Sequence, residues 1–227
     1  MRTSIYHFFP LALPLLLVFL FLLGLVIALV EIGVLRYAYE KIGISRRYIL
    51  SILLLSFFGS YVNIPIAELP PETVFSDQVV SFFGMPYTVP RVEQWPGTVI
   101  TLNVGGAIIP TILSIYLLMK NRMFGRALAA VAIVATAVHW LAYPVRGVGI
   151  AVPWLVPPLV AAGAALLLSR RAAPSLAYIA GSLGTLIGAD LLNLGKVAGL
   201  GAPIASIGGA GTFDGIFLTG ILAVLLA

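Results

Sequence analysis

Two aspartates, Asp190 and Asp214, are the residues whose type and position best suit chemistry, because both fall inside long apolar segments. A carboxylate at membrane depth costs at least about 2.5 kcal/mol, so it normally faces the interior of a helix bundle and marks a site or a pathway. Two carboxylates that lie close together cannot both be ionised. They share one proton instead. The pair therefore predicts acid–base catalysis, in which one carboxylate activates water and the other protonates.

Asparagines and glycines elsewhere in the apolar segments are the candidate binding groups. Asn193 is three residues from Asp190, so the two share one face of a helix. We predict that substrate or ion is bound by Asn63, Asn103, Asn193, Gly209 and Gly211. The alternative is structural: asparagines join helices, worth about 0.6 kcal/mol each in membranes, and the two acids are separately satisfied by polar neighbours.

Other catalytic classes lack the residues that they require. The sequence has no cysteine and only two histidines, so it offers no thiol nucleophile, disulfide or cysteine-ligated metal. It contains no H-E-x-x-H motif of a zinc protease, and the glycine run at 208–211 lacks the lysine of a phosphate-binding loop. We predict no metal and no cofactor.

The composition requires a membrane. Of the 227 residues, 61% are hydrophobic and 9% are charged, whereas about a quarter of a soluble domain is charged. The net charge of +5 comes from short basic clusters between apolar runs, which fits loops facing anionic lipid and not a nucleic-acid surface. Membrane lipid is therefore the expected partner, and nucleic acid is not.

The apolar runs predict an all-α membrane protein, a single domain over residues 1–227 built as a bundle of about seven transmembrane helices. The expected spans are 10–39, 48–64, 98–119, 127–143, 152–169, 175–194 and 212–227. Residues 11–30 carry no charge, which is longer than the apolar part of a signal peptide, so the first span is expected to be retained.

Two connections between the spans stand out. Residues 67–97 form the one long polar loop, and Gly84-Met85-Pro86 within it separates two β-prone segments, which predicts a small extracytoplasmic hairpin. Residues 195–211 are apolar but rich in glycine, and non-helical backbone at membrane depth must be buried or line a wet cavity. We expect a packed or partly re-entrant segment there.

Basic residues set the expected orientation. The first, third and fifth loops hold eight of them, and the alternate loops hold three, namely Arg91, Arg146 and Lys196. By the positive-inside rule the N-terminus lies outside and the C-terminus in the cytoplasm, as expected for a multi-pass protein of the cell membrane. Asp190 then lies about 22 Å along its helix, toward the outer side. Asp214 begins the next, antiparallel span, so both carboxylates are expected at similar depth.

Glycine spacing in the same helix predicts close packing. Ala177, Gly181, Gly184 and Gly188 form a stripe of small residues roughly opposite Asp190. Such stripes let helix backbones approach closely in membranes. One face of this helix should therefore pack tightly while the other presents the acid.

Four segments of the sequence resemble an uncharacterised prokaryotic multi-pass family, a domain of unknown function. They are residues 59–65, 103–110, 181–194 and 207–217. The likeness extends over most of the chain, and it implies no activity.

A looser resemblance is to the presenilin and signal-peptide-peptidase group, in which aspartates on two successive helices form an intramembrane protease site. Asp190 and Asp214 would be the matching pair. This sequence departs from that group's pattern, since two extra residues separate Gly211 from Asp214, no tyrosine precedes Asp190, and the Pro-Ala-Leu motif has no counterpart.

These observations lead to one leading hypothesis and two alternatives. The leading one is a membrane-embedded aspartate-dyad hydrolase, similar to intramembrane aspartyl proteases, that cleaves membrane or exported polypeptides, with transmembrane peptides as substrates. The first alternative is a small proton- or cation-coupled transporter that uses the same aspartates. The second is a structural or assembly subunit of the membrane. The oligomeric state stays open.

Overall fold

A computed structural model of the chain describes residues 18, 20–27, 33–82, 85–95, 97–145, 149–198, 202–209 and 215–227. The chain divides into two units, Met1–Tyr37 and Ala38–Ala227. In the first unit, residues 20–27 are helical, and Gly33 adopts a left-handed conformation with φ of +87° before α2 begins. The single predicted span over 10–39 is therefore interrupted at Gly33, because a left-handed residue cannot continue a helix.

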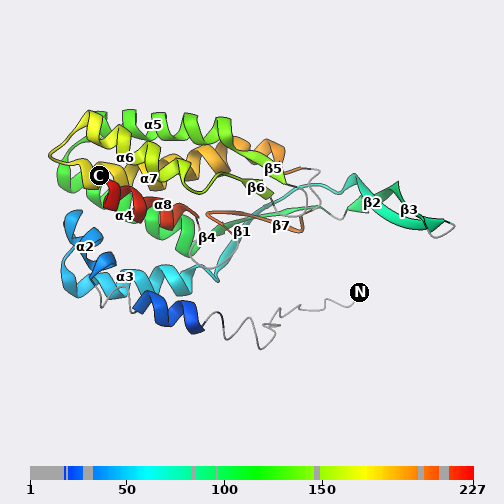
Figure 1. Ribbon diagram of the computed structural model, residues 1–227, viewed down its shortest axis with the longest axis horizontal. Helices are drawn as coiled ribbons and strands as arrows, with labels where there is room; N and C mark the ends of the chain where they lie inside the picture. Colours follow the sequence, from blue (N-terminus) through cyan, green and yellow to red (C-terminus); the bar gives the residue numbers. More distant parts are fainter. Residues whose placement is uncertain are drawn as a thin grey trace. The chain divides into compact units, whose positions relative to one another are not determined.

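Helices make up most of the second unit (Figure 1). They are α2 (Val34–Lys41, which starts in the first unit), α3 (Arg46–Gly59), α4 (Ile109–Asn121), α5 (Phe124–Leu141), α6 (Val156–Leu168), α7 (Ala173–Thr185) and α8 (Gly215–Leu226). A π-helical turn, η1 (Val104–Ile108), precedes α4, while a second π turn, η2 (Leu186–Asp190), and a 3₁₀ turn, η3 (Leu191–Lys196), continue α7. Prolines in the first turn begin α4, α6 and α7, where the missing N–H is not needed.

Three of the described helices are long and apolar enough to cross a membrane, namely Val104–Asn121, Phe124–Leu141 and Ala173–Lys196. The bent pair of α2 and α3 makes a fourth if it is one span. The helices α6 and α8 have 13 and 12 residues, which gives them about 20 Å of length against a hydrocarbon core of about 30 Å. The expectation of apolar membrane helices is confirmed, and a bundle of seven spans is not.

The protein is mostly helical, as predicted, but it also contains a three-stranded sheet that the all-α prediction did not include. The strands of this sheet are β1 (Asn63–Glu68), β4 (Val99–Asn103) and β7 (Ile204–Ile207), in the order β1-β4-β7. The first pair is antiparallel and the second is parallel. The β-branched run in β4 favours extended backbone, so the predicted spans over 48–64 and 98–119 each lose one end to the sheet. The glycine-rich segment 195–211 supplies β7, which pairs with β4; that this segment is partly re-entrant stays a prediction.

Two hairpins complete the described chain. The strands β2 (Glu72–Phe82) and β3 (Met85–Trp95) pair in antiparallel register with Phe82 opposite Met85, so the predicted hairpin is present. Its position outside the cytoplasm stays a prediction. A shorter pair, β5 (Tyr143–Val145) and β6 (Gly149–Ala151), joins α5 to α6.

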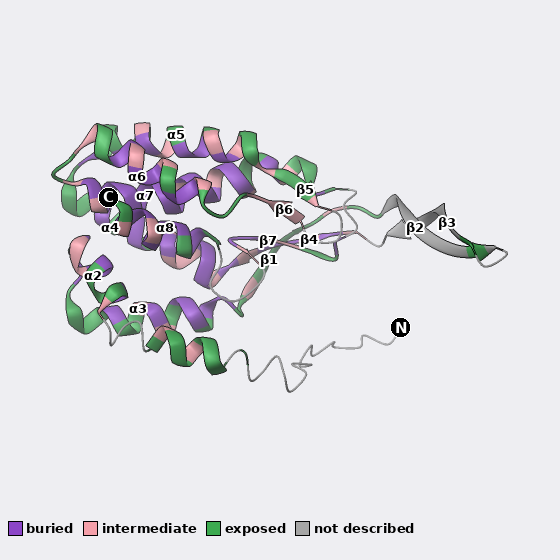
Figure 2. Cartoon of the chain, viewed as in Figure 1, coloured by how far each residue is buried: buried purple, intermediate pink, exposed green. Residues whose placement is uncertain are grey.

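The stripe of small residues on α7 and η2 packs as predicted. A Cβ atom added at Gly184 would lie 2.6 Å from the Cβ of Val134 in α5, and one added at Gly188 would lie 2.4 Å from the Ala135 carbonyl oxygen. On α8, a Cβ atom added at Gly220 would lie 2.5 Å from the Ser182 hydroxyl oxygen. Most of α7 is consequently buried between its neighbours (Figure 2).

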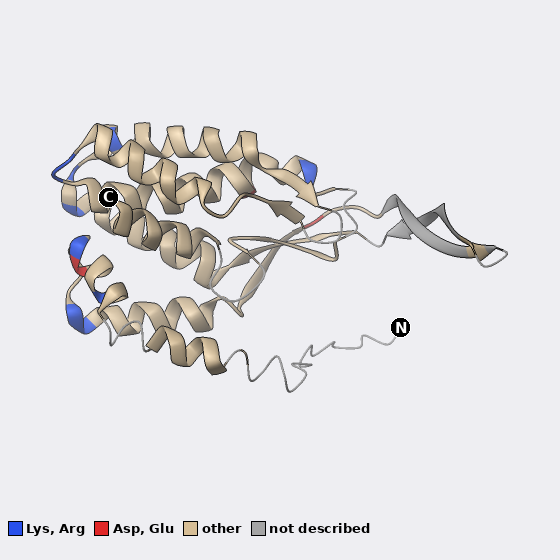
Figure 3. Ribbon diagram, viewed as in Figure 1, with Lys and Arg blue, Asp and Glu red and all other residues tan. Residues whose placement is uncertain are grey.

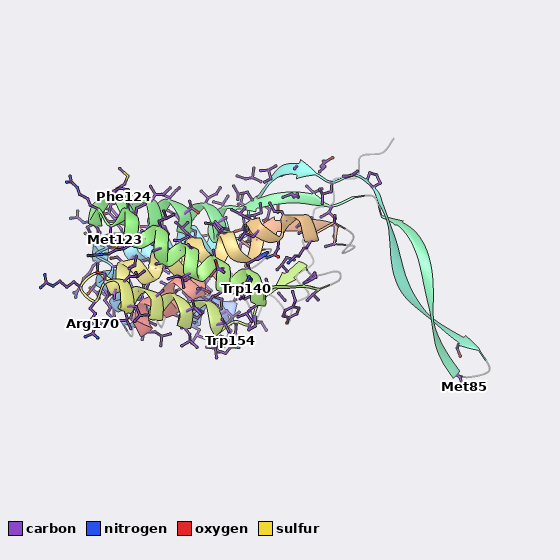
Figure 4. All side chains as sticks on the ribbon, turned by 90° about the horizontal axis from the view of Figure 1, so that it is seen from above. Met85, Met123, Phe124, Trp140, Trp154 and Arg170 are labelled. Carbon is purple, nitrogen blue, oxygen red and sulfur yellow. The ribbon has the colours of Figure 1, made fainter. Side chains whose placement is uncertain are left out.

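The basic loops meet at one end of the second unit. Lys120 Nζ donates to the Gly43 carbonyl oxygen at 2.5 Å, Arg126 donates to the Ser169 hydroxyl at 3.4 Å, and Lys41 donates to the Val224 carbonyl oxygen at 3.3 Å. Figure 3 shows lysine and arginine gathered at this end. Figure 4 shows Trp140 and Trp154 farther along the helices from Phe124 and Arg170; these tryptophans are 83% and 74% exposed, as expected for a membrane interface.

Candidate functional site

Asp190 lies where the helix begun by α7 loses its regular form. It is the last residue of the π turn η2, and the 3₁₀ turn η3 follows it directly. Breaks of this kind in membrane helices often accompany functional sites, since they release main-chain groups and redirect side chains. Asp190 is partly buried, and its Oδ2 accepts a hydrogen bond from the Gly208 N–H at 2.7 Å.

The contacts between α7 and α5 fix the depth of Asp190. The two helices run in the same direction, because Gly184 lies against Val134 and Gly188 lies between Ala135 and Val138. Two residues beyond Gly188, Asp190 is thus about level with the exposed Trp140. The acid lies near the end of the helices away from the basic loops, and its position toward the outer side of the membrane stays a prediction.

The strand β7 turns an open side toward Asp190. In a parallel ladder, alternate residues direct their main-chain groups to opposite sides. Since the Val99 N–H bonds the Pro203 carbonyl oxygen at 3.1 Å, the groups of Ala205 face β4, and those of Ile204 and Ser206 face away from it. The Gly208 N–H continues this outward series and reaches the Asp190 carboxylate. Among the described strands, none pairs with β7 on this side, although the Ser206 carbonyl oxygen already accepts the Gly209 N–H at 3.2 Å.

A cavity of about 310 Å³ lies along the open side of β7. Asp190, Leu194 and Val197 form one wall, and β6 contributes Gly149 and Ile150. The strand itself contributes all four of its residues, and Gly209 follows them. No lysine or arginine is among these lining residues. The polar features of the cavity wall include the Asp190 carboxylate, the Ser206 hydroxyl and main-chain groups of β7.

Asn103 and Asn63 form a polar network beside the cavity. Asn103 is fully buried; its Nδ2 donates to the Ser60 carbonyl oxygen at 2.7 Å and to Asn63 Oδ1 at 3.0 Å. Its Oδ1 accepts the Gly106 N–H at 2.8 Å, so Asn103 caps the π turn η1. The expectation that both asparagines lie in helix ends is wrong, since they face each other across β1 and β4.

Ser206 connects this network to the cavity wall. Its hydroxyl lies 2.7 Å from Asn63 Oδ1 and 2.5 Å from the Gly209 carbonyl oxygen. Because the Asn103 amide is held in one orientation by the Gly106 N–H, Asn63 must present its oxygen to Asn103 and Ser206. The single hydroxyl proton of Ser206 can serve only one of its two oxygen neighbours. The oxygen that does not receive this proton, on Asn63 or on Gly209, keeps a lone pair that can accept a hydrogen bond beside the cavity.

Comparison with known proteins identifies the family. A family model described as "Protein of unknown function (DUF1614)" matches residues 57–226. This chain belongs to the DUF1614 family. The expected membership of an uncharacterised family is thus confirmed. No curated protein and no solved structure matches the chain, and the resemblance to the presenilin group stays a prediction.

The DUF1614 match includes every predicted site residue, but the structure joins only some of them. Asp190 and Gly209 line the cavity, and Asn63 and Asn103 reach it through Ser206. Asn193 instead donates to the Gly188 and Ala189 carbonyl oxygens at 2.8 and 2.9 Å, which satisfies main-chain groups of η2. Its role in the structure is to support the broken helix below Asp190.

Two predicted site residues, Gly211 and Asp214, lie outside the described residues. The shared site of Asp190 and Asp214 therefore stays a prediction. Sequence reasoning missed Ser206 and Gly208, although both fall within the DUF1614 match. The available signal was weak: the β-branched Ile204 and Ile207 stand just before two glycines, which is compatible with a short strand that ends in a tight turn.

Proposed function

We propose that this chain is a membrane-embedded hydrolase of peptide bonds in which Asp190 and Asp214 form the acid–base pair. The observation that carries the proposal is the position of Asp190 beside the open side of β7, at the wall of a cavity. An extended peptide can add to an open strand edge through main-chain hydrogen bonds. A substrate strand bound in this way would bring a peptide carbonyl next to the Asp190 carboxylate.

The antiparallel packing of α8 on α7 supports a role for Asp214. Gly220 lies against Ser182, and five residues of α8 measure about 7.5 Å. Gly215, the first residue of α8, is thereby about level with the start of η2, and Ile216 shares a buried cluster with Leu186. Asp214 precedes Gly215 in the sequence, and we propose that it lies at the depth of Asp190.

The proposed reaction divides two proton transfers between the acids. The Gly208 N–H donates to Asp190, which stabilises its ionised form, so Asp190 is the base that takes a proton from water. Asp214 starts protonated and donates to the peptide carbonyl oxygen. The hydroxide oxygen bonds the carbonyl carbon to give a tetrahedral gem-diol. Asp190 then returns its proton to the nitrogen, the C–N bond breaks, and one gem-diol hydroxyl gives its proton back to Asp214, so the products are a carboxylic acid and an amine.

The proposed setting is the cell membrane, crossed about seven times, with the N-terminus outside and the basic end of the helices in the cytoplasm. The gathering of the basic loops at one end supports this orientation. Asp190 would then lie near the outer face, where membrane or exported polypeptides are the available substrates.

Cleavage of transmembrane peptides by purified protein in lipid vesicles tests the proposal. Replacing Asp190 or Asp214 by asparagine should lower the rate by about 10²- to 10⁴-fold. The matched control is Asp77→Asn in β2, which changes the chain's third aspartate and should leave the rate unchanged. Absence of cleavage by the unaltered chain across a panel of such peptides, or equal rates in all variants, would refute it.

A proton- or cation-coupled transporter is the second candidate, favoured by the two π turns that interrupt the helices at η1 and η2. Transporters commonly bind coupling ions where helices are discontinuous. Here Asp190, the Ser206 hydroxyl and the Gly209 carbonyl oxygen supply oxygen ligands at the cavity. Ion-driven uptake into vesicles that is abolished by Asp190→Asn, with no peptide cleavage, would favour this candidate.

A further inference from the structure

A second cavity, an apolar groove of about 470 Å³, lies between α3 and α4. Tyr48, Ile52 and Leu55 line it from α3 at helical spacing. Ile109, Ile112 and Tyr116 line it from α4 at the same kind of spacing. These are the faces that two packed helices would normally bury against each other. The groove shares no lining residue with the Asp190 cavity.

Large apolar side chains are exposed along this groove. Leu55 and Ile112 are each 61% exposed, and Tyr48 and Tyr116 are 55% and 47% exposed. The stretch from Tyr48 to Leu55 measures about 10 Å along the helix axis. A continuous apolar channel of this kind in a membrane helix pair offers a place for a flexible hydrocarbon chain.

Two cations mark one end of the groove. Arg47 lies with Cζ 5.6 Å from the centre of the Tyr48 ring, and Lys120 lies with Nζ 5.6 Å from the centre of the Tyr116 ring. Each of the two tyrosines that line the groove at this end therefore has a cationic side chain over its ring. The Lys120 ammonium has three N–H donors, and one of them bonds the Gly43 carbonyl oxygen, which holds the side chain in place.

The start of α3 adds to this positive field. Ser45 makes no side-chain cap, the first turn contains no acid, and Arg46 and Arg47 occupy it instead. Arginine at a helix N-terminus is unfavourable, because its charge has the same sign as that end of the helix dipole. Glu40 offsets Arg46 through an ion pair, whereas no acidic side chain lines the groove among the described residues.

We propose that this groove binds an anionic phospholipid, with one acyl chain between α3 and α4 and the phosphate between Arg47 and Lys120. The apolar walls match the chain, and the two cations at one end match the headgroup. Tyr48 and Tyr116 lie at the junction between them, which is the usual position of tyrosine at a membrane interface. The basic end of the helices is also where anionic lipid is expected.

Lipid retention by the full chain in detergent, measured by native mass spectrometry, tests this proposal. Phosphatidylglycerol and phosphatidylcholine with identical acyl chains are the two probes. The unaltered chain should retain phosphatidylglycerol preferentially. Arg47→Gln should weaken phosphatidylglycerol retention about fivefold, the effect of one basic residue at a membrane surface, and weaken phosphatidylcholine retention less, because the choline ammonium already offsets the phosphate charge. Ile112→Trp should fill the groove and weaken both lipids.

Two control variants separate the groove from general lipid contact. Arg171→Gln removes a charge from another basic loop, and Leu159→Trp enlarges an exposed side chain on α6; neither should alter retention. The proposal is overturned if Arg171→Gln acts as strongly as Arg47→Gln, or if Ile112→Trp leaves both lipids bound. It is also overturned if Ile112→Trp dissociates an oligomer, because a second copy of the chain would then cover the groove.

Discussion

Replacing Gly208 by alanine should destabilise the protein strongly, because two separate costs coincide at this residue. Gly208 has φ of +89°, a conformation that costs an L-residue about 1–2 kcal/mol. Its new Cβ would lie 2.6 Å from both the Cβ and the main-chain nitrogen of Ala107. Overpacking of this kind costs about 1–3 kcal/mol. The expected loss is therefore about 2–5 kcal/mol in free energy of unfolding, measured by denaturant titration in detergent micelles.

Gly33 provides the matched control for the backbone cost. Its φ is +87°, and a Cβ added there would meet no atom of the described residues within 4 Å. Gly33→Ala should therefore lose only the conformational part, about 1–2 kcal/mol. If the two variants unfold at the same denaturant concentration, the contact between the turn after β7 and η1 contributes nothing, and the steric reasoning fails. A Gly208→Ala variant that is less stable than Gly33→Ala should also lose activity, because the displaced N–H no longer holds Asp190.

Three further predictions follow from the polar groups and the charge distribution. Asp190→Asn and Asp214→Asn should each lower the cleavage rate as stated above yet leave the melting temperature unchanged or higher, since Asp190→Asn removes a partly buried charge and so relieves desolvation, and replacing a protonated Asp214 removes no charge; loss of folding in both would show that the acids are structural. Asn103→Ala should cost about 2–4 kcal/mol, because it leaves buried main-chain partners unsatisfied, whereas Asn121→Ala on the surface should cost less than about 1 kcal/mol; equal melting temperatures would contradict this. A reporter that is active only in the cytoplasm should be active when fused after Ala227, and silence from a stably expressed fusion would reverse the orientation.

Long apolar runs predicted the helices that carry Asp190 and its neighbours. The expected spans 127–143 and 175–194 agree closely with α5 and with Ala173–Lys196. At this length, only a helix satisfies the main-chain groups in lipid. The glycine contacts of α7 were predictable for the same reason, since the helix fixes which side chains share a face.

The sheet was not predictable by the same reasoning. Short apolar runs such as Val99–Asn103 and Ile204–Ile207 fit a strand and a helix end equally well, and hydropathy does not separate them. Asn63 and Asn103 were thus assigned to helices, although they are cross-strand partners. The pairing depends on which distant segments meet, and this information is absent from any single window of the sequence.

The parallel pairing of β4 with β7 also determines when the site forms during synthesis. Val99 pairs with Ile204, about 105 residues later in the chain, which corresponds to roughly 5–20 s of translation. During that interval β4 is exposed on one edge, and Asn63 has no Ser206 to accept from. The hydrogen bond from the Gly208 N–H to Asp190 can consequently form only after α4 to α7 have been made. A chain that ends before β7 carries Asp190 without the N–H that holds it.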